Sequence, residues 1–72
     1  MKKFKVILEC NARGDVNVSV FTVHARNSTA AFAHALEQDG FYSLDDVQDD
    51  EALGQGIRRF CLEEATGYVI AM

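Results

Sequence analysis

Hydrophobic and polar residues alternate along the first stretch of the chain, residues 4–10. The apolar side of this stretch is formed by Phe4, Val6, Leu8 and Cys10. An alternation of period two predicts a β-strand with one apolar face. Residues 11–15 contain Gly14 and have the length of a hairpin connection, so we expect a second, antiparallel strand to follow.

The second predicted strand, residues 16–26, is rich in β-branched residues and changes phase along its length. Its first half points one apolar set to one side: Val16, Val18 and Val20. Its second half points another set to the opposite side: Phe21, Val23 and Ala25. Either a β-bulge between Val20 and Phe21 returns the apolar side chains to the core, or the strand is regular and a partner covers its other face. The pattern leaves both explanations open.

A helix is predicted over residues 29–39, which contain four alanines and no helix breaker. Asn27 or Ser28 can cap the free N–H groups of its first turn. Gly40 stands where a left-handed residue ends a helix. One apolar stripe recurs at helical spacing, formed by Ala31, Phe32, Ala35 and Leu36. The pattern therefore predicts an amphipathic helix that packs this stripe against the sheet.

Residues 42–56 have the least regular pattern. Ser43, followed three residues later by Asp46, resembles a capping box. The three acids at positions 49–51 argue against a longer helix, because they would crowd the negative end of its dipole. We therefore predict a short helical turn within an irregular acidic segment.

The C-terminal part of the chain predicts a second hairpin. Residues 57–64 form its first strand, 65–67 its turn and 68–72 its return strand, with Phe60 and Leu62 facing inward. The predicted fold is therefore a single α+β domain over residues 1–72. It has a four-stranded antiparallel sheet in ββαββ order, with one main helix packed on one face.

Composition places the chain among small globular domains. Its 72 residues are 49% hydrophobic and 25% charged, an ordinary balance that leaves room for one small core. Apolar runs are too short to span a bilayer. Cys10 and Cys61 are too few for a disulfide framework or a metal knuckle, and are expected to be small buried residues. We therefore predict a cytoplasmic protein with no metal site and no cofactor.

Charge is distributed unevenly along the sequence. The net charge is −4, but residues 27–57 hold seven acids and neither Lys nor Arg. This imbalance argues against direct nucleic-acid binding, which requires a basic footprint. The acidic segment is either a plain solvated loop or a surface that steers a basic protein partner. On the second interpretation the steering residues are Asp45, Asp46, Asp49, Asp50 and Glu51, and the aromatic anchors are Phe41 and Tyr42.

Two other functions are considered. A structural or regulatory homodimer would assemble through the open sheet face that carries Val16, Val18 and Val20. A small enzyme would need a cysteine nucleophile, either Cys61 or Cys10 activated by His24. A domain of this size has little room for a deep pocket, so we predict a non-catalytic protein.

The segment Phe21-Thr22-Val23-His24-Ala25, followed by Ser28 and the alanine-rich helix, resembles a strand-to-helix pattern of small phage and prophage proteins. Some anti-CRISPR proteins share this pattern, and the resemblance covers about residues 16–40. Because these inhibitors have no common motif, no functional residue is transferred. The resemblance implies a phage- or prophage-encoded inhibitor or regulator. From the acidic segment, we expect it to dock on a basic surface of a host protein complex, such as one that binds nucleic acid.

Overall fold

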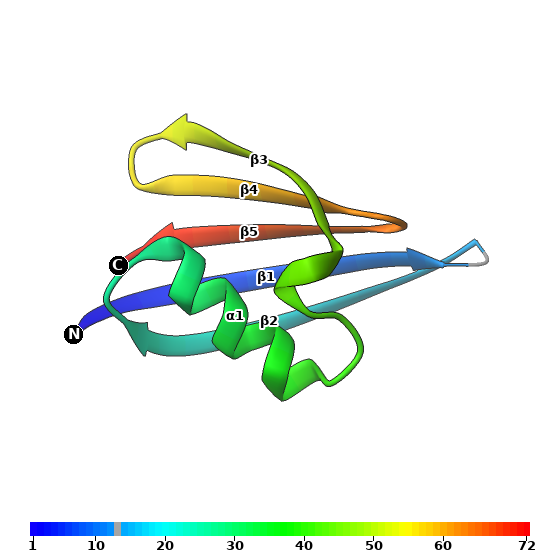
Figure 1. The fold of residues 1–72 in the computed structure, drawn as a ribbon, viewed down its shortest axis with the longest axis horizontal. Coiled ribbons are helices and arrows are strands. Elements are labelled where there is room, and N and C mark those ends of the chain that lie inside the picture. The colour runs from blue at the N-terminus through cyan, green and yellow to red at the C-terminus, as the bar shows by residue number, and fades with distance from the viewer. Residues whose placement is uncertain (13) are drawn as a thin grey trace.

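The computed structural model describes residues 1–12 and 14–72, with the backbone alone at Ala12. Its elements, in chain order, are β1 (Lys2–Ala12), β2 (Asp15–Ala25), α1 (Ser28–Asp39), the 3-10 turn η1 (Leu44–Asp46), β3 (Val47–Gly54), β4 (Ile57–Leu62) and β5 (Ala65–Ala71). The strands form one sheet in the order β2-β1-β5-β4-β3 (Figure 1), and each neighbouring pair is antiparallel. The N-terminal strand β1 therefore lies between β2 and the C-terminal strand β5.

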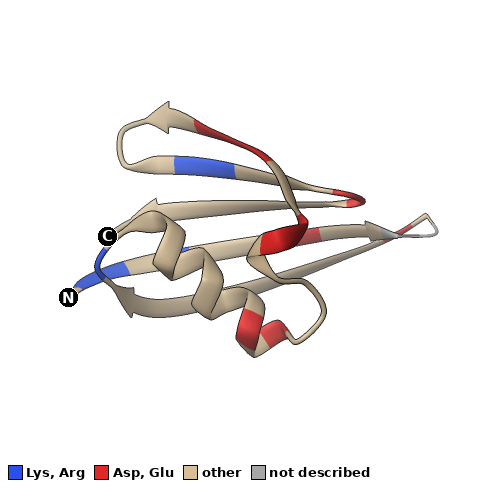
Figure 2. Ribbon diagram, in the orientation of Figure 1, with Lys and Arg blue, Asp and Glu red and all other residues tan. Residues whose placement is uncertain are grey.

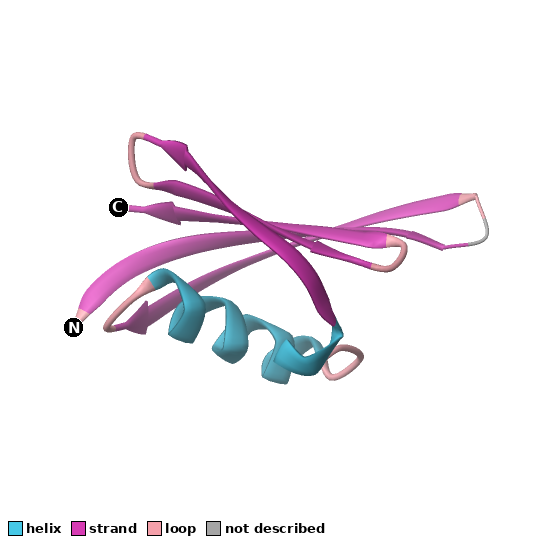
Figure 3. Ribbon diagram, turned by 45° about the horizontal axis from the view of Figure 1, so that its top comes forward, coloured by secondary structure: helices cyan, strands magenta, loops and turns pink. Residues whose placement is uncertain are grey.

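The two faces of this sheet differ in what lies on them. Both α1 and η1 lie on the same side (Figure 3), where α1 contacts β1, β2 and β5. We call this side the covered face and the opposite side the open face. Strand alternation assigns each side chain to one of them, because successive strand residues point to opposite faces.

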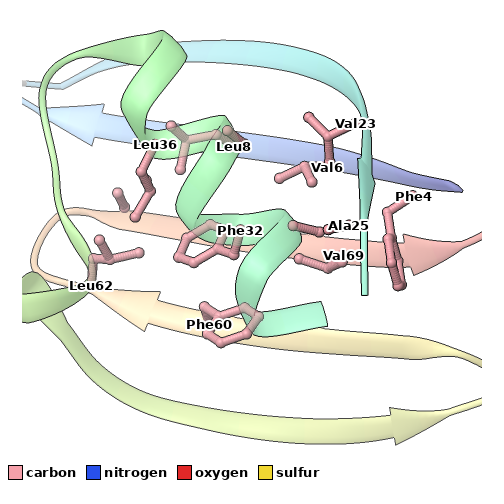
Figure 4. Packing of buried hydrophobic residues seen from close by; sticks show 13 residues of the cluster. Phe4, Val6, Leu8, Val23, Ala25, Phe32, Leu36, Phe60, Leu62 and Val69 are labelled. Carbon is pink, nitrogen blue, oxygen red and sulfur yellow. The ribbon is translucent and has the colours of Figure 1, made fainter. Parts of the chain in front are cut away.

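The hydrophobic core lies between α1 and the covered face (Figure 4). The Phe32 ring of α1 stacks on the Phe60 ring of β4, with centroids 4.4 Å apart and planes 9° from parallel. The buried core residues are Phe4, Val6, Leu8, Val23, Ala25, Ala31, Phe32, Ala35, Leu36, Phe60, Leu62, Ala65 and Val69. The predicted inward positions of Phe60 and Leu62 are therefore confirmed.

The helix prediction is confirmed together with both of its ends. The backbone N–H of Ala30 donates to the Asn27 side-chain oxygen at 2.8 Å, so Asn27 is the N-cap. Gly40 has a φ of +82°, and its N–H donates to the Leu36 carbonyl at 2.8 Å. The four residues of the predicted apolar stripe are the buried residues of α1. Local capping and a single apolar stripe thus determine this element.

The prediction of four strands in ββαββ order is wrong, because the acidic segment forms the additional strand β3. A short turn, η1, does follow Ser43, as the capping pattern predicts. The chain then continues as an edge strand that pairs with β4, with register shifts between Val47 and Asp49 and between Ala52 and Gly54. Extended backbone sends the consecutive acids to alternate faces. The unfavourable interaction with a helix dipole therefore does not apply to this strand.

The turn of the last hairpin lies earlier than predicted. Residues Glu63 and Glu64 form it, with Glu64 at a φ of +61°, and β5 already begins at Ala65. Gly67, which suggested the turn, lies within β5 beneath the Phe32 ring. A Cβ atom at Gly67 would come within 2.2 Å of Phe32 Cε1. This glycine therefore makes room for an aromatic ring.

The bulge proposed between Val20 and Phe21 does not form. The pairing of β2 with β1 runs without a shift from Lys2 opposite Ala25 to Ala12 opposite Asp15. The strand therefore carries its two apolar sets on different faces. Phe21, Val23 and Ala25 face α1, while Val16, Val18 and Val20 lie on the open face with 60%, 57% and 59% of their surface exposed.

Candidate acidic cleft

A cleft of about 430 Å³ lies between the connection from α1 to β3 and the turn from β4 to β5. We call it the acidic cleft. Four of its eight lining residues are carboxylates, and the others are aromatic, aliphatic or amide side chains. The complete lining is Phe41, Tyr42, Asp45, Asp46, Val47, Gln48, Glu63 and Glu64.

Local hydrogen bonds hold the two walls of the cleft in place. The Tyr42 hydroxyl donates to the Glu63 carbonyl at 3.4 Å and so joins the α1–β3 connection to the β4–β5 turn. Within the wall formed by the α1–β3 connection, the Asp46 carboxylate accepts a hydrogen bond from the Ser43 backbone N–H at 2.9 Å. Val47 then pairs with Leu62 at the start of β3. Segments that are distant in sequence are thereby fixed around one opening.

The aromatic wall of the cleft is exposed to solvent. Phe41 is 78% exposed, and its ring meets the Tyr42 ring edge to face, with centroids 4.9 Å apart. An exposed ring beside carboxylates offers both apolar contact and the negative face that attracts cations. Such a wall is suited to the side chain of an arginine or a lysine.

The acidic cleft belongs to an acidic end of the molecule. Figure 2 shows Asp and Glu gathered around η1, the end of α1 and the β4–β5 turn, whereas Lys and Arg lie near the N-terminus and on β4. Partial burial raises the pKa of the Tyr42 phenol, and nearby negative charge, including that of Glu64, adds to the rise. The phenol is therefore neutral and able to donate its hydrogen bond at neutral pH.

Four of the seven residues predicted for protein binding line this cleft: Phe41, Tyr42, Asp45 and Asp46. Glu63 and Glu64 complete it but were not predicted, because sequence reasoning placed them within a strand. The signal that would have found them is a tight two-residue turn between two apolar runs, which brings both carboxylates to the end of the hairpin.

The remaining three predicted residues lie elsewhere, on β3. Asp50 accepts a hydrogen bond from Arg58 at 2.6 Å, and Glu51 accepts one from Arg59 at 2.7 Å. These pairs are half exposed, so each contributes little to stability. They nevertheless offset two of the acidic charges. Asp49 shares the open face with Glu51, since they are two positions apart in the strand.

The two cysteines lie on different faces of the sheet and are half-buried, not fully buried as predicted. Cys10 packs against the core on the covered face. Burial raises the pKa of its thiol, and the charge of Asp39 adds to the rise, so the thiolate is disfavoured. His24 pairs with Lys3 at the far end of β1 from Cys10 and on the opposite face. The proposed Cys10–His24 pair is therefore not assembled.

Comparisons with protein families, with curated proteins and with solved structures found no match for this chain. Among the described residues, no cluster of His, Cys, Asp or Glu has the arrangement needed to hold a metal ion. Within the described residues, 1–12 and 14–72, no helix is long and apolar enough to cross a membrane. The geometry and charge of the acidic cleft are therefore the features of this chain that bear on its function.

Proposed function

We propose that this protein is a non-catalytic binding module whose acidic cleft docks on a basic surface of a partner protein. The observation that supports this function is the meeting of four carboxylates with an exposed aromatic ring at one end of the molecule. Clustered negative potential raises the rate of encounter with a basic partner and fixes its orientation. Phe41, beside these charges, supplies the aromatic anchor typical of interface hot spots.

The charge of the cleft also indicates the kind of partner. An acidic surface of this kind competes with nucleic acid for a basic protein surface, because both ligands are polyanionic. Residues 16–40 also resemble small phage and prophage proteins. We therefore propose a phage- or prophage-encoded inhibitor or regulator of a host complex. Its cytoplasmic location is consistent with two free cysteines, since thiols stay reduced there.

An arginine-rich peptide is a direct probe of this function. Peptide binding is measured by fluorescence anisotropy at low and at physiological salt. The double variant Asp45→Asn, Glu63→Gln removes one carboxylate from each wall of the cleft. We expect it to weaken peptide binding about tenfold at low salt and to flatten the salt dependence.

The matched control is the double variant Glu37→Gln, Asp49→Asn, which removes the same charge from two exposed positions outside the cleft, on α1 and β3. It should change peptide affinity by less than about threefold, because only the net charge is altered. Equal losses in the two double variants would show that net charge alone attracts the peptide. That result, or an unchanged affinity in the cleft variant, would refute the proposed site.

A further inference from the structure

The open face carries an apolar band that crosses four of the five strands. On β2 the band begins with the three exposed valines described above. It continues through half-buried residues of β1, β5 and β4 that share this face by strand register: Ile7, Tyr68, Ile70 and Ile57. Monomeric proteins seldom expose a continuous apolar surface of this kind unless it binds something.

The regular register of β2 keeps its valines in this band. A bulge within β2 would have turned the valines toward the core, yet the β1–β2 register is continuous. The opposite edge strand, β3, differs in having two register shifts and three consecutive acids, Asp49, Asp50 and Glu51. Such features protect sheet edges from pairing with other chains. The edge strand that carries the valines, β2, pairs with β1 without such a shift.

We propose that the open face packs against the open face of a second copy of this chain. The resulting dimer is a two-layer sandwich with a helix on each outer side. Two sheets pack in this way when side chains of their inner faces interdigitate. The monomer buries apolar side chains on the covered face alone, and the dimer would bury those of the open face as well. Small domains commonly gain stability from association in this way.

The extents of the molecule set an upper limit on the area that this face can bury. In the view of Figure 1, which looks onto the sheet, the molecule measures 36 × 23 Å, an outline of about 830 Å² (36 × 23). A standard protein interface buries roughly 800 Å² on each partner. A dimer interface of standard size therefore requires nearly the whole open face.

The charges on β1 make the face complementary to itself. Lys5 and Glu9 lie on the open face on either side of Ile7, and both are exposed. A two-fold axis through Ile7 reverses the strand direction in the second copy. It places each Lys5 over the second copy's Glu9. Two copies thus gain two ion pairs around an apolar centre, as expected of an isologous interface.

Sedimentation equilibrium over a micromolar range tests the dimer. The wild-type protein should shift from 8.0 kDa to twice that mass as its concentration rises. The double variant Val18→Gln, Val20→Gln should weaken dimerisation about a hundredfold, because it removes four valines from the interface. Leu44→Gln, on exposed η1, is the matched control and should leave the dimer unchanged. A wild-type protein that stays at 8.0 kDa overturns the proposal.

Two further variants test the geometry. Lys5→Glu and Glu9→Lys should each weaken the dimer about tenfold, and the variant that carries both should recover it. Ile70→Gln lies two strands from β2, so it weakens a face-to-face dimer but not a dimer paired through the β2 edge. Failure of the charge swap to restore association, or an Ile70→Gln protein that dimerises normally, overturns the arrangement. Circular dichroism confirms that each variant folds.

This inference is independent of the acidic cleft. The cleft variant Asp45→Asn, Glu63→Gln should sediment like the wild type, and the valine variant should bind the arginine-rich peptide like the wild type. Either proposal can therefore fail while the other stands.

Discussion

The two faces of the sheet are made by the same strands but differ in how deeply their apolar side chains are buried. On the covered face, Val6 is fully buried and Leu8 is 1% exposed. On the open face, their neighbour Ile7 is half-buried, and it lies opposite Val20, which is 59% exposed. The strands of this protein therefore supply one apolar surface that is used in folding and a second that folding leaves unused.

Substitutions on the two faces should therefore affect different properties, stability on one and association on the other. A change on the covered face acts on the free energy of unfolding, because its side chains are packed against α1 at crystal-like density. A change on the open face acts first on association, because solvent can accommodate a new side chain there. Predictions that compare one residue from each face test this division directly.

The largest effect is expected at Gly67. Gly67→Ala places a Cβ atom 2.2 Å from Phe32 Cε1, and the Phe32 ring is fully buried and stacked on Phe60. We expect a loss of about 4 kcal/mol, more than most overpacking substitutions cost, because neither ring can move away. A domain of this length has roughly 4–11 kcal/mol of stability in total. Urea unfolding should therefore show a marginally folded variant.

Two controls accompany this prediction. Thr66→Ala changes the neighbouring residue, on the open side of β5, and should cost less than about 1 kcal/mol. Adding Phe32→Leu to Gly67→Ala should cost less than the sum of the two single losses, because the smaller side chain relieves the clash. Additive losses would indicate that Phe32 is not the cause.

A smaller contrast is expected between neighbours on β1. Leu8→Ala should cost about 3 kcal/mol, from lost burial and from the cavity that remains. Ile7→Ala should cost about 1 kcal/mol in the dilute monomer, because Ile7 is only half-buried. Urea unfolding at submicromolar protein concentration measures both values. Similar losses for the two variants would mean that the open face is also packed within the monomer.

Much of the fold could be predicted because its signals are local. Helix α1 has a capping residue, an apolar stripe and a terminal glycine, and each of these acts within a few residues. The prediction of β3 failed because the signal that stabilises it is not local. β3 forms because its backbone pairs with β4, and there the carboxylates of Asp50 and Glu51 also bond to Arg58 and Arg59. Sequence reasoning took these acids as evidence of irregular structure.

Non-local signals also explain why two residues of the acidic cleft, Glu63 and Glu64, were not predicted. Phe41, Asp45 and Asp46 belong to one segment, so their proximity could be expected. Glu63 and Glu64 reach the cleft only because β4 lies beside β3 and the hairpin turns at these residues. Gly67 led to a wrong prediction of the turn. A glycine is needed at this position because the Phe32 ring of the distant helix leaves no room for a side chain. The pairing of strands, and not a local sequence pattern, brings the residues of this site together.

The smallest effect is a pH dependence carried by Cys10 on the covered face. Burial, and then the charge of Asp39, raises its pKa above the ordinary value of 9.0. The unfolded chain therefore releases this proton at lower pH than the folded protein. The stabilising contribution is complete below about pH 9 and is lost as the pH rises through the higher folded value. In a Cys61→Ala background, the rate of thiol alkylation should reach its midpoint above pH 9.0, and Asp39→Asn should lower that midpoint. A midpoint at or below 9.0 would show that the thiol is as well solvated as in the unfolded chain and would refute the effect of burial at Cys10.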